Sequence, residues 1–435
     1  MLIQNFAPSQ PRRRPLLALA HFPSRFRREV SGGVYRPEID GLRFFAIAIV
    51  VFGHLFQRGV RFFPSFQAVA DGSAIGGVFH LGPGLGVYLF FAISGFIIAT
   101  QARKAKTSPL SVAFLKSYFG RRVLRIEPPY VILLVVSWLL LSLTGYQPER
   151  TQQFFTEPHS LNLSLLGSLF YAHDLLWGTF PRLFPPGWSL EVEVQFYIVA
   201  PALFWIWFRL GSTRTRILLA AAVLLAGILV SIFAPRQIGP FFTYYSILSY
   251  FPLFWLGILL ADLRIWLTES VVGLPAALLT AVGWLGLLDF VCLPEAPDTL
   301  VPGLMFWGAA IVAITAMFVS AFAPQSGFRR FCAQPWISLI GGACYSIYLV
   351  HMQLLQFLST LAAKLAPGLS FGGVLALMVL LVGVVLVVGL TFYVVIERTF
   401  MMPRWHILLL RRLRLLGPPP QSLPGGAGMK PTRTV

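Results

Sequence analysis

Residues 40–56, DGLRFFAIAIVVFGHLF, form an apolar run that only three charged or titratable side chains interrupt: Asp40, Arg43 and His54. A run this long and this apolar is typical of a helix that crosses a membrane. A charged side chain within such a helix costs at least about 2.5 kcal/mol and usually faces the interior of a bundle, where it binds or reacts. The stretch therefore predicts a membrane helix with a functional inner face.

The composition agrees with a protein that lies mostly in lipid. Of its 435 residues 57% are hydrophobic and 11% charged, whereas soluble proteins contain about 25% charged residues. The net charge of +18 does not indicate nucleic-acid binding, because the basic residues fall in short clusters between apolar runs, as membrane topology requires. The three cysteines are isolated in the sequence, so we expect neither a disulfide framework nor a metal site.

The apolar runs predict an all-α polytopic membrane helix bundle with about ten transmembrane helices. Of the 34 lysines and arginines, 27 then fall on the side of the N-terminus, six on the other side and one, Arg43, within a span. This asymmetry predicts that both termini are cytoplasmic. The expected spans, each near the required ~20 residues, are roughly 40–57, 84–100, 127–145, 188–208, 215–234, 242–262, 272–291, 301–320, 338–359 and 372–396.

One membrane domain, residues 37–400, is expected between two cytoplasmic tails. Residues 1–36 form a basic N-terminal tail, and residues 401–435 form a C-terminal tail whose Pro- and Gly-rich end is expected to be disordered. The outward segment 146–187 is too polar for a span. We expect it to contain an interfacial or re-entrant helix over the mouth of the bundle.

Arg43 and His54 are separated by eleven residues, or about 20° more than three helical turns, so they project from one face about 16 Å apart along the axis. A shared face predicts a shared interior path, with Arg43 near the cytoplasm and His54 toward the outer side. Asp40 lies about 20 Å from His54 on a regular helix. The alternative is an arginine that anchors the helix and a histidine that bonds a neighbouring helix.

A second polar stretch, YFGRRVLRIEPPY, occupies residues 118–130, immediately before the third expected span. Arg122 and Arg125 share a helical face, and Arg121 lies four residues from Arg125. Clustered guanidinium groups bind phosphate oxygens in bidentate pairs. They are equally typical of the cytoplasmic end of any membrane helix.

The stretch PPGWSLEVEVQFYIVAPALF, residues 185–204, carries two carboxylates. Glu191 and Glu193 point about 200° apart on a helix and cannot both face one cavity. We expect Glu191 to be exposed at the outer rim, and Glu193 to pair with an arginine or to orient a histidine. Trp188 and Tyr197 are typical interface anchors.

Two further spans contain polar or small residues. His351 lies in CYSIYLVHMQL, residues 344–354, where a lone histidine is more often structural than catalytic. Ser94 and Gly95 are small residues that allow neighbouring helices to approach closely.

Together these stretches resemble the acyltransferase-3 family of integral-membrane O-acyltransferases, over residues 35 to about 400. Two departures stand out: Tyr88 occupies a position that is Asp in many members, and Val194 follows Glu193 where a second acidic residue is common. The matching motifs are Asp40-Gly41-Leu42-Arg43 with His54, Phe90-Phe91 with Ser94-Gly95-Phe96, Arg122 and Arg125 with Pro128, Trp188-Ser189-Leu190 with Glu193 and Tyr197, and Tyr345-Ser346 with Tyr348-Leu349 and His351.

The resemblance implies transfer of an acyl group, acetyl above all, from cytoplasmic acyl-CoA to a hydroxyl of a cell-surface or lipid-linked glycan. It places the protein in the bacterial inner (cytoplasmic) membrane as a multi-pass enzyme. Acyl-CoA is then a donor substrate, and no tightly bound cofactor or metal is expected. The expected partners are acyl-CoA, a glycan or glycolipid acceptor and membrane lipid; the oligomeric state is open.

Roles for the residues follow from this chemistry. His54 is expected as the general base, oriented by Asp40 or Glu193, and Arg43 as a residue that lines the donor path or polarises the thioester. An acyl-His54 intermediate stays open. Arg121, Arg122 and Arg125 are expected to bind the CoA phosphates, and Trp188, Tyr197 and His351 the acceptor.

Other classes of protein also carry intramembrane Arg, His and Glu. Such residues mark substrate paths in transporters, so a transporter of an acylated sugar or similar small molecule is the alternative. A scaffold within a glycan-synthesis complex is the third class.

Overall fold

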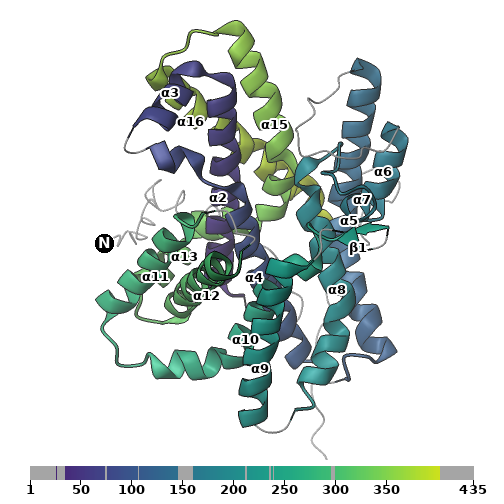
Figure 1. Ribbon diagram of the computed structural model, residues 1–435, viewed down its shortest axis with the longest axis vertical. Coiled ribbons are helices and arrows are strands. Elements are labelled where there is room, and N and C mark those ends of the chain that lie inside the picture. Colours follow the sequence, from purple (N-terminus) through teal and green to yellow (C-terminus); the bar gives the residue numbers. More distant parts are fainter. Residues whose placement is uncertain are drawn as a thin grey trace, which may run out of the picture.

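The computed structural model describes residues 26, 35–73, 76–105, 107–145, 160–210, 213–234, 237–238, 240–294 and 299–401. This part of the chain is a bundle of helices, as expected (Figure 1). Its one pair of strands, β1 (Gln237–Ile238) and β2 (Phe241–Phe242), is antiparallel. Most of the two expected tails, 1–36 and 401–435, lies outside the described residues.

Nine of the described helices are long and apolar enough to cross a membrane. The remaining expected span, 272–291, corresponds to α11 (Ala276–Val291). This helix has 16 residues and at 1.5 Å per residue is shorter than a typical bilayer core. The nine are α2 (Pro37–Phe62), α4 (Pro83–Arg103), α5 (Val112–Thr144), α8 (Trp188–Trp207) with its first turn η3 (Pro185–Gly187), α9 (Thr213–Phe233), α10 (Ile247–Ser270), α12 (Leu300–Phe322), α15 (Cys344–Leu365) and α16 (Phe371–Phe392), which continues through η4 (Tyr393–Glu397) and α17 (Arg398–Met401).

Short helices connect these spans. On the side where α2 ends lie α3 (Pro64–Gly72) and η2 (Gly76–His80), and before α15 lie α13 (Gly327–Cys332) and α14 (Pro335–Gly342). The outward segment contains two short helices, α6 (Leu161–Leu169) and α7 (His173–Trp177), and its residues 146–159 lie outside the described part. Neither α6 nor α7 is long enough to span a bilayer.

The third span begins earlier than its apolar run. Helix α5 has 33 residues and starts at Val112, where the Ser111 hydroxyl accepts a hydrogen bond from the Phe114 amide. It continues without a break through Pro128 and Pro129. The arginines expected just before a span at 127–145 therefore lie inside the helix, because capping at Ser111, and not hydropathy, sets its start.

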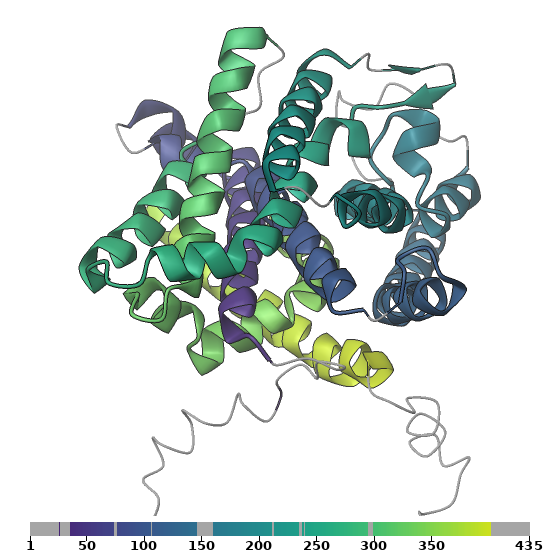
Figure 2. The ribbon, with the colours of Figure 1, turned by 90° about the horizontal axis from the view of Figure 1, so that it is seen from below.

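Helix α2 lies at the centre of the bundle, with α4 on one side and α14 and α15 on the other (Figures 1 and 2). Helices α4 and α10 cross closely because Gly95 and Gly257 have no Cβ atom. A Cβ atom at Gly95 would collide with the Phe254 carbonyl, and one at Gly257 would collide with the Ala92 carbonyl. This confirms the close packing predicted for Gly95.

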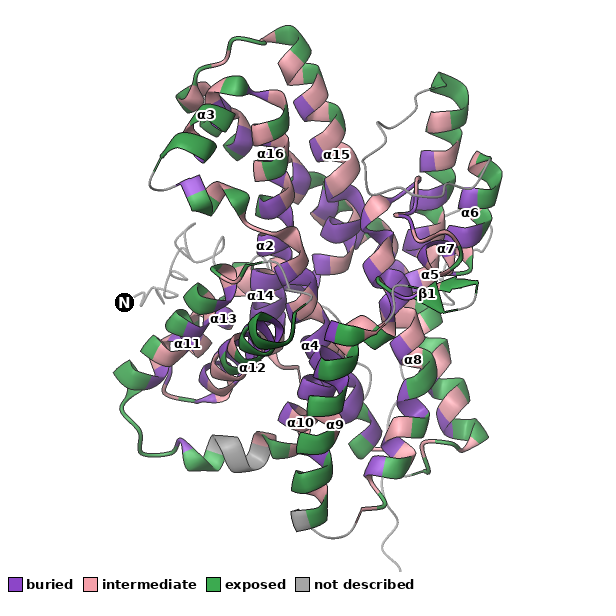
Figure 3. Cartoon of the chain, in the orientation of Figure 1, coloured by how far each residue is buried: buried purple, intermediate pink, exposed green. Residues whose placement is uncertain are grey.

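The distribution of burial agrees with a lipid-facing exterior. Buried residues gather along α2, α4 and the start of α15 (Figure 3). Exposed positions on the peripheral spans are apolar, including Leu218 of α9, Val301 of α12 and Val379 of α16. An apolar outer surface on helices of this length is what a bilayer requires.

Candidate active site

Two histidines from distant parts of the sequence face each other inside the bundle. The ring centroids of His54 on α2 and His351 on α15 are 5.3 Å apart, with the ring planes tilted by 38°. His351 is fully buried, and His54 is partly exposed. We call these two residues the imidazole pair.

Hydrogen bonds define the protonation of His351. Its Nδ1 lies 2.6 Å from the Tyr348 carbonyl oxygen, which only accepts, so Nδ1 carries the hydrogen and Nε2 presents a lone pair. Among the described residues, the buried Nε2 has no hydrogen-bond partner. The Nδ1 of His54 lies 3.2 Å from the Gln57 side-chain oxygen, which favours the same tautomer there.

Arg58 adds a positive charge beside the imidazole pair. Its Nη2 lies 3.6 Å from the Met352 sulfur, and its charge acts on both imidazoles. Sequence reasoning counted Arg58 only as an outward basic residue. The i, i+4 spacing from His54 is the signal that places both side chains on one face.

Tyr348 connects the imidazole pair to the start of α8. Its hydroxyl lies 2.8 Å from the Ser189 hydroxyl and also donates to the Pro186 carbonyl. The Trp188-Ser189-Leu190 motif thus holds the turn of α15 that carries His351. Sequence reasoning did not single out Ser189 or Tyr348 as site residues.

Glu193 belongs to a separate set of contacts. One of its carboxylate oxygens accepts hydrogen bonds from Ser94, at 2.5 Å, and from Tyr197, at 2.6 Å. The Tyr118 hydroxyl donates to the Tyr197 carbonyl, at 3.1 Å. We call Ser94, Glu193, Tyr197 and Tyr118 the Glu193 network. In the described structure Glu193 makes no hydrogen bond to His54, so the expectation that it orients this histidine is wrong.

Asp40 does not orient His54 either. Its carboxylate accepts a bond from Arg43 one helical turn away, at 2.8 Å, and both side chains are buried. Its carbonyl packs directly on Gly341 of α14, where an added Cβ atom would collide with it. Asp40 is therefore held at the start of α2, about 20 Å along the helix from His54.

Arg43 and His54 do share a face, as their spacing predicts. His54 faces His351 of α15, and the charge of Arg43 acts on Cys344 at the start of the same helix. Arg43 is nevertheless committed to its buried ion pair with Asp40.

The arginines of α5 make different contacts with their neighbours. Arg122 lies 3.6 Å from the centre of the Tyr118 ring and 5.1 Å from that of Tyr197, and its Nη1 donates to the Tyr118 carbonyl at 2.9 Å. Arg121 is exposed and donates to Ser117 on its own helix. The charge of Arg121 also acts on Arg122, so the phosphate site expected at the three arginines stays a prediction.

Arg125 meets a carboxylate that sequence reasoning missed. The charges of Glu397 and, more weakly, Glu193 act on Arg125. Glu397 is fully buried on a π-helical turn of the last span and accepts a bond from Ser346, at 2.6 Å. Single π turns within α-helices are frequent at functional sites. The available signal was an acidic residue directly after the expected span 372–396.

The residues expected to bind the acceptor lie in three different places. Trp188 packs in an aromatic cluster, 4.7 Å from the ring centre of Tyr245 and 5.4 Å from that of Tyr250. Tyr197 belongs to the Glu193 network, and His351 to the imidazole pair. The assignment of these three residues to the acceptor therefore stays a prediction.

Glu191 is not exposed at a rim, contrary to expectation. It is fully buried and accepts bonds from the amides of His173, at 3.2 Å, and Asp174, at 2.9 Å, at the start of α7. Burial lowers the pKa of His173 to about 4 and raises the pKa of Asp174 to about 8. The backbone N–H groups at the start of α7 attract this carboxylate inward.

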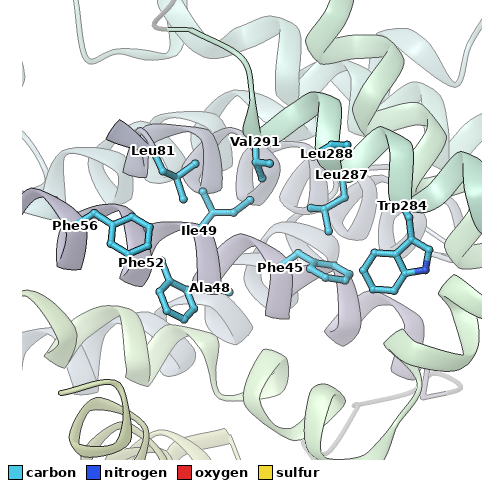
Figure 4. A pocket seen from close by; sticks show the side chains of 10 residues that line it. All are labelled: Phe45, Ala48, Ile49, Phe52, Phe56, Leu81, Trp284, Leu287, Leu288 and Val291. Atoms are coloured by element: carbon cyan, nitrogen blue, oxygen red, sulfur yellow. The ribbon is translucent and has the colours of Figure 1, made fainter. Parts of the chain in front are cut away.

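An open apolar groove of about 380 Å³ lies between α2 and α11 (Figure 4). Its α2 residues include Phe52 and Phe56, two positions on either side of His54. Residues two apart on a helix point in nearly opposite directions, so the groove lies on the face of α2 away from the imidazole pair. No group of three or more metal-binding side chains occurs among the described residues.

Comparison with known proteins identifies the family. A family model described as an acyltransferase domain matches residues 36–396. A putative peptidoglycan O-acetyltransferase of Bacillus subtilis is 24% identical over 73% of this chain and 48% of the relative. A putative membrane-bound transacylase of Komagataeibacter xylinus is 26% identical over 92% of this chain and 89% of the relative. The peptidoglycan O-acetyltransferase of Listeria monocytogenes is 25% identical over 73% of this chain and 49% of the relative.

The chain spans about half the length of the two peptidoglycan O-acetyltransferases that it matches. No solved structure is a significant match. Because nine of the described helices are long and apolar enough to cross a membrane, the protein is a multi-pass membrane protein. Because the family model covers most of its 435 residues, the chain belongs to the acyltransferase-3 family.

Proposed function

We propose that the protein transfers an acyl group, acetyl above all, from cytoplasmic acyl-CoA to a sugar hydroxyl of a cell-surface or lipid-linked glycan. The observation that carries this proposal is the imidazole pair beside Arg58. A hydroxyl that attacks a thioester must lose its proton, and a neutral imidazole is suited to accept it near neutral pH.

The reaction assigns a role to each side chain at this site. His54, the partly exposed member of the pair, accepts the hydroxyl proton while the oxygen attacks the acyl carbon. Arg58 stabilises the negative charge that develops on the carbonyl oxygen. The carbon–sulfur bond then breaks, and the CoA thiolate takes up a proton and leaves as the free thiol.

The donor is proposed to enter from the cytoplasmic side, past Arg122 and Arg125. Both lie on α5 about one turn apart, and guanidinium groups suit the phosphates of CoA. Arg43 and Asp40 are assigned to the packing of α2 on α14, because their charges satisfy each other.

The acceptor and the location are proposed from the relatives. Two of the three relatives are named as peptidoglycan O-acetyltransferases, which favours a glycan hydroxyl as acceptor. A donor in the cytoplasm and an acceptor outside favour the bacterial cytoplasmic membrane, where lipid surrounds the apolar exterior.

The test measures release of free thiol from acetyl-CoA by the full chain in lipid vesicles, with soluble peptidoglycan glycan fragments as acceptor. We expect His54→Ala to lower the rate at least about 100-fold, since general-base catalysis contributes about 10²–10⁴-fold. The matched control is His80→Ala, at an exposed histidine on η2, which should keep the wild-type rate.

Label from [14C]acetyl-CoA should appear on the glycan in the wild type and not in His54→Ala. Equal rates for both proteins would remove His54 as the base. Absence of transfer across a panel of acyl-CoA donors and glycans, with transport of an acylated sugar into the vesicles, would favour the transporter instead.

A further inference from the structure

His351 carries a polar atom whose burial needs an explanation. The residue has no exposed surface, and its Nε2 lacks a hydrogen-bond partner within the described structure. A buried acceptor left without a partner costs about 1–3 kcal/mol, and most buried side-chain polar atoms have one.

The other side of the His351 ring has an ordinary structural role. Nδ1 donates to the Tyr348 carbonyl, and the Tyr348 hydroxyl contacts Ser189. These contacts fix the position of the ring and its tautomer. They do not require a lone pair at Nε2, because an asparagine side chain could make the same bond to Tyr348.

His54 is the neighbour that this lone pair can serve. The ring centroids of the two histidines lie 5.3 Å apart, a separation at which two ring nitrogens turned toward each other come within the about 3 Å of an N–H···N bond. In the described structure no such bond joins the two rings, and the Nε2 of His351 has no partner. At rest both histidines are acceptors on this side and have no hydrogen to share. Once His54 takes up a proton it becomes a donor.

We propose that His351 is a positioning residue for the reaction, which accepts a hydrogen bond from protonated His54 and so shares the proton taken from the acceptor hydroxyl. This inference rests on the proposed function. The hydroxyl proton moves to His54, the oxygen electron pair forms the ester bond, and the carbon–sulfur bond breaks. The shared proton then passes to the CoA thiolate, so that both histidines return to their neutral state.

The charges around the pair make such sharing useful. Arg58 is the charged group that acts on both rings, and a second positive charge on His54 lies close to it. The Nε2 lone pair of His351 is a neutral acceptor on another helix, and its ring lies against that of His54. Gln57, on α2 itself, accepts from the other ring nitrogen.

The experiment compares two variants of His351. One retains a donor at the Nδ1 position, and the other places an acceptor near the Nε2 position. In His351→Asn the amide nitrogen takes the place of Nδ1 and keeps the bond to the Tyr348 carbonyl, but no acceptor remains at the Nε2 position. In His351→Gln the longer side chain places an amide oxygen near the Nε2 position. Both are measured as full chains in vesicles, with kcat and both KM values.

We expect His351→Asn to lower kcat at least tenfold, with KM for acetyl-CoA and for the glycan within twofold of wild type. The kcat of His351→Gln should be at least threefold higher than that of His351→Asn. Wild-type kcat in His351→Asn would show that the histidine is only structural. A raised glycan KM with unchanged kcat would instead assign it to acceptor binding, and either result would overturn the inference.

A second measurement does not depend on how well that variant folds. In ¹⁵N-histidine-labelled protein, the Nε2 signal of His351 should be unprotonated in the wild type and should shift in His54→Ala. A protonated Nε2, or a signal that ignores the loss of His54, would also overturn the inference. If His54→Ala is inactive while His351→Asn is fully active, the proposed function stands and only this inference fails.

Discussion

The imidazole pair and the Glu193 network differ in how their polar groups are satisfied. In the network, one carboxylate oxygen of Glu193 accepts from both Ser94 and Tyr197, and the Tyr118 hydroxyl donates to the Tyr197 carbonyl. In the pair, the buried Nε2 of His351 has no hydrogen-bond partner among the residues that the structure describes. Groups that neighbours satisfy mainly hold helices together, whereas an unsatisfied group is available to a substrate or to a proton.

This difference assigns the two regions separate tasks. Contacts of the Glu193 network connect α4, α5 and α8, and on the proposed function these helices hold the donor end. The imidazole pair connects α2 and α15 and is the place where a proton can move. The variants below test whether activity and stability divide along the same line.

Among the variants that test this comparison, the largest effect is expected at Arg58. Arg58→Leu removes the positive charge beside the imidazole pair and should lower kcat about 100-fold, the loss typical of removing one group that stabilises a developing oxyanion. Arg61→Leu is the matched control, because Arg61 lies one turn further along α2 and is exposed. Thiol release from acetyl-CoA measures both. Equal rates for the two variants would mean that Arg58 does not act on the reaction.

Much of this arrangement could be predicted from the sequence, because helix periodicity and hydropathy are local properties. The spans, the shared face of Arg43 and His54, and the opposite directions of Glu191 and Glu193 all follow from a repeat of 3.6 residues. Periodicity states which residues share a face. It does not state which helix that face meets.

The contacts that the sequence did not predict depend on which helices pack against each other. His54 and His351 come together only because α2 packs against α15, and Glu191 turns inward because the short helix α7 offers it two amides. Glu397 was missed because a π turn, which hydropathy does not reveal, brings it into the bundle. Spacing alone also does not show that the Arg121 side chain bonds back to Ser117.

A smaller effect, on stability, is expected at the start of α2. Arg43→Leu leaves Asp40 buried without its cation and should lower the free energy of unfolding by about 3–5 kcal/mol. The double variant with Asp40→Asn removes the stranded charge and should recover a large part of that loss. Unfolding in denaturant, followed by tryptophan fluorescence, measures both.

The activity of that double variant sharpens the comparison. If Arg43 and Asp40 only hold α2 against α14, the refolded double variant should transfer acetyl groups at nearly the wild-type rate. A stable but inactive double variant would place Arg43 on the donor path, as its position on the face of His54 suggested.

The smallest effect is a dependence of stability on pH at α7, outside the spans. The pKa of Asp174 is raised from 3.8 to about 8 by burial, so the folded state binds more protons than the unfolded state and stability falls as pH rises through that window. The pKa of His173 is lowered from 6.5 to about 4, so below pH 6.5 stability falls as pH falls. Between about pH 4 and 6.5 the two slopes oppose each other.

Of these two groups, Asp174 alone contributes a slope from about pH 6.5 to 8, at most about 1.4 kcal/mol per pH unit. The melting temperature of the wild type should therefore decline across this range. Asp174→Asn, which keeps the neutral shape of the protonated acid, should remove the decline and leave acetyl transfer unchanged. If the decline persists in this variant, another group causes the slope. If the variant loses activity, the α7 region affects the imidazole pair directly, whereas we expect it only to support the pair through α8.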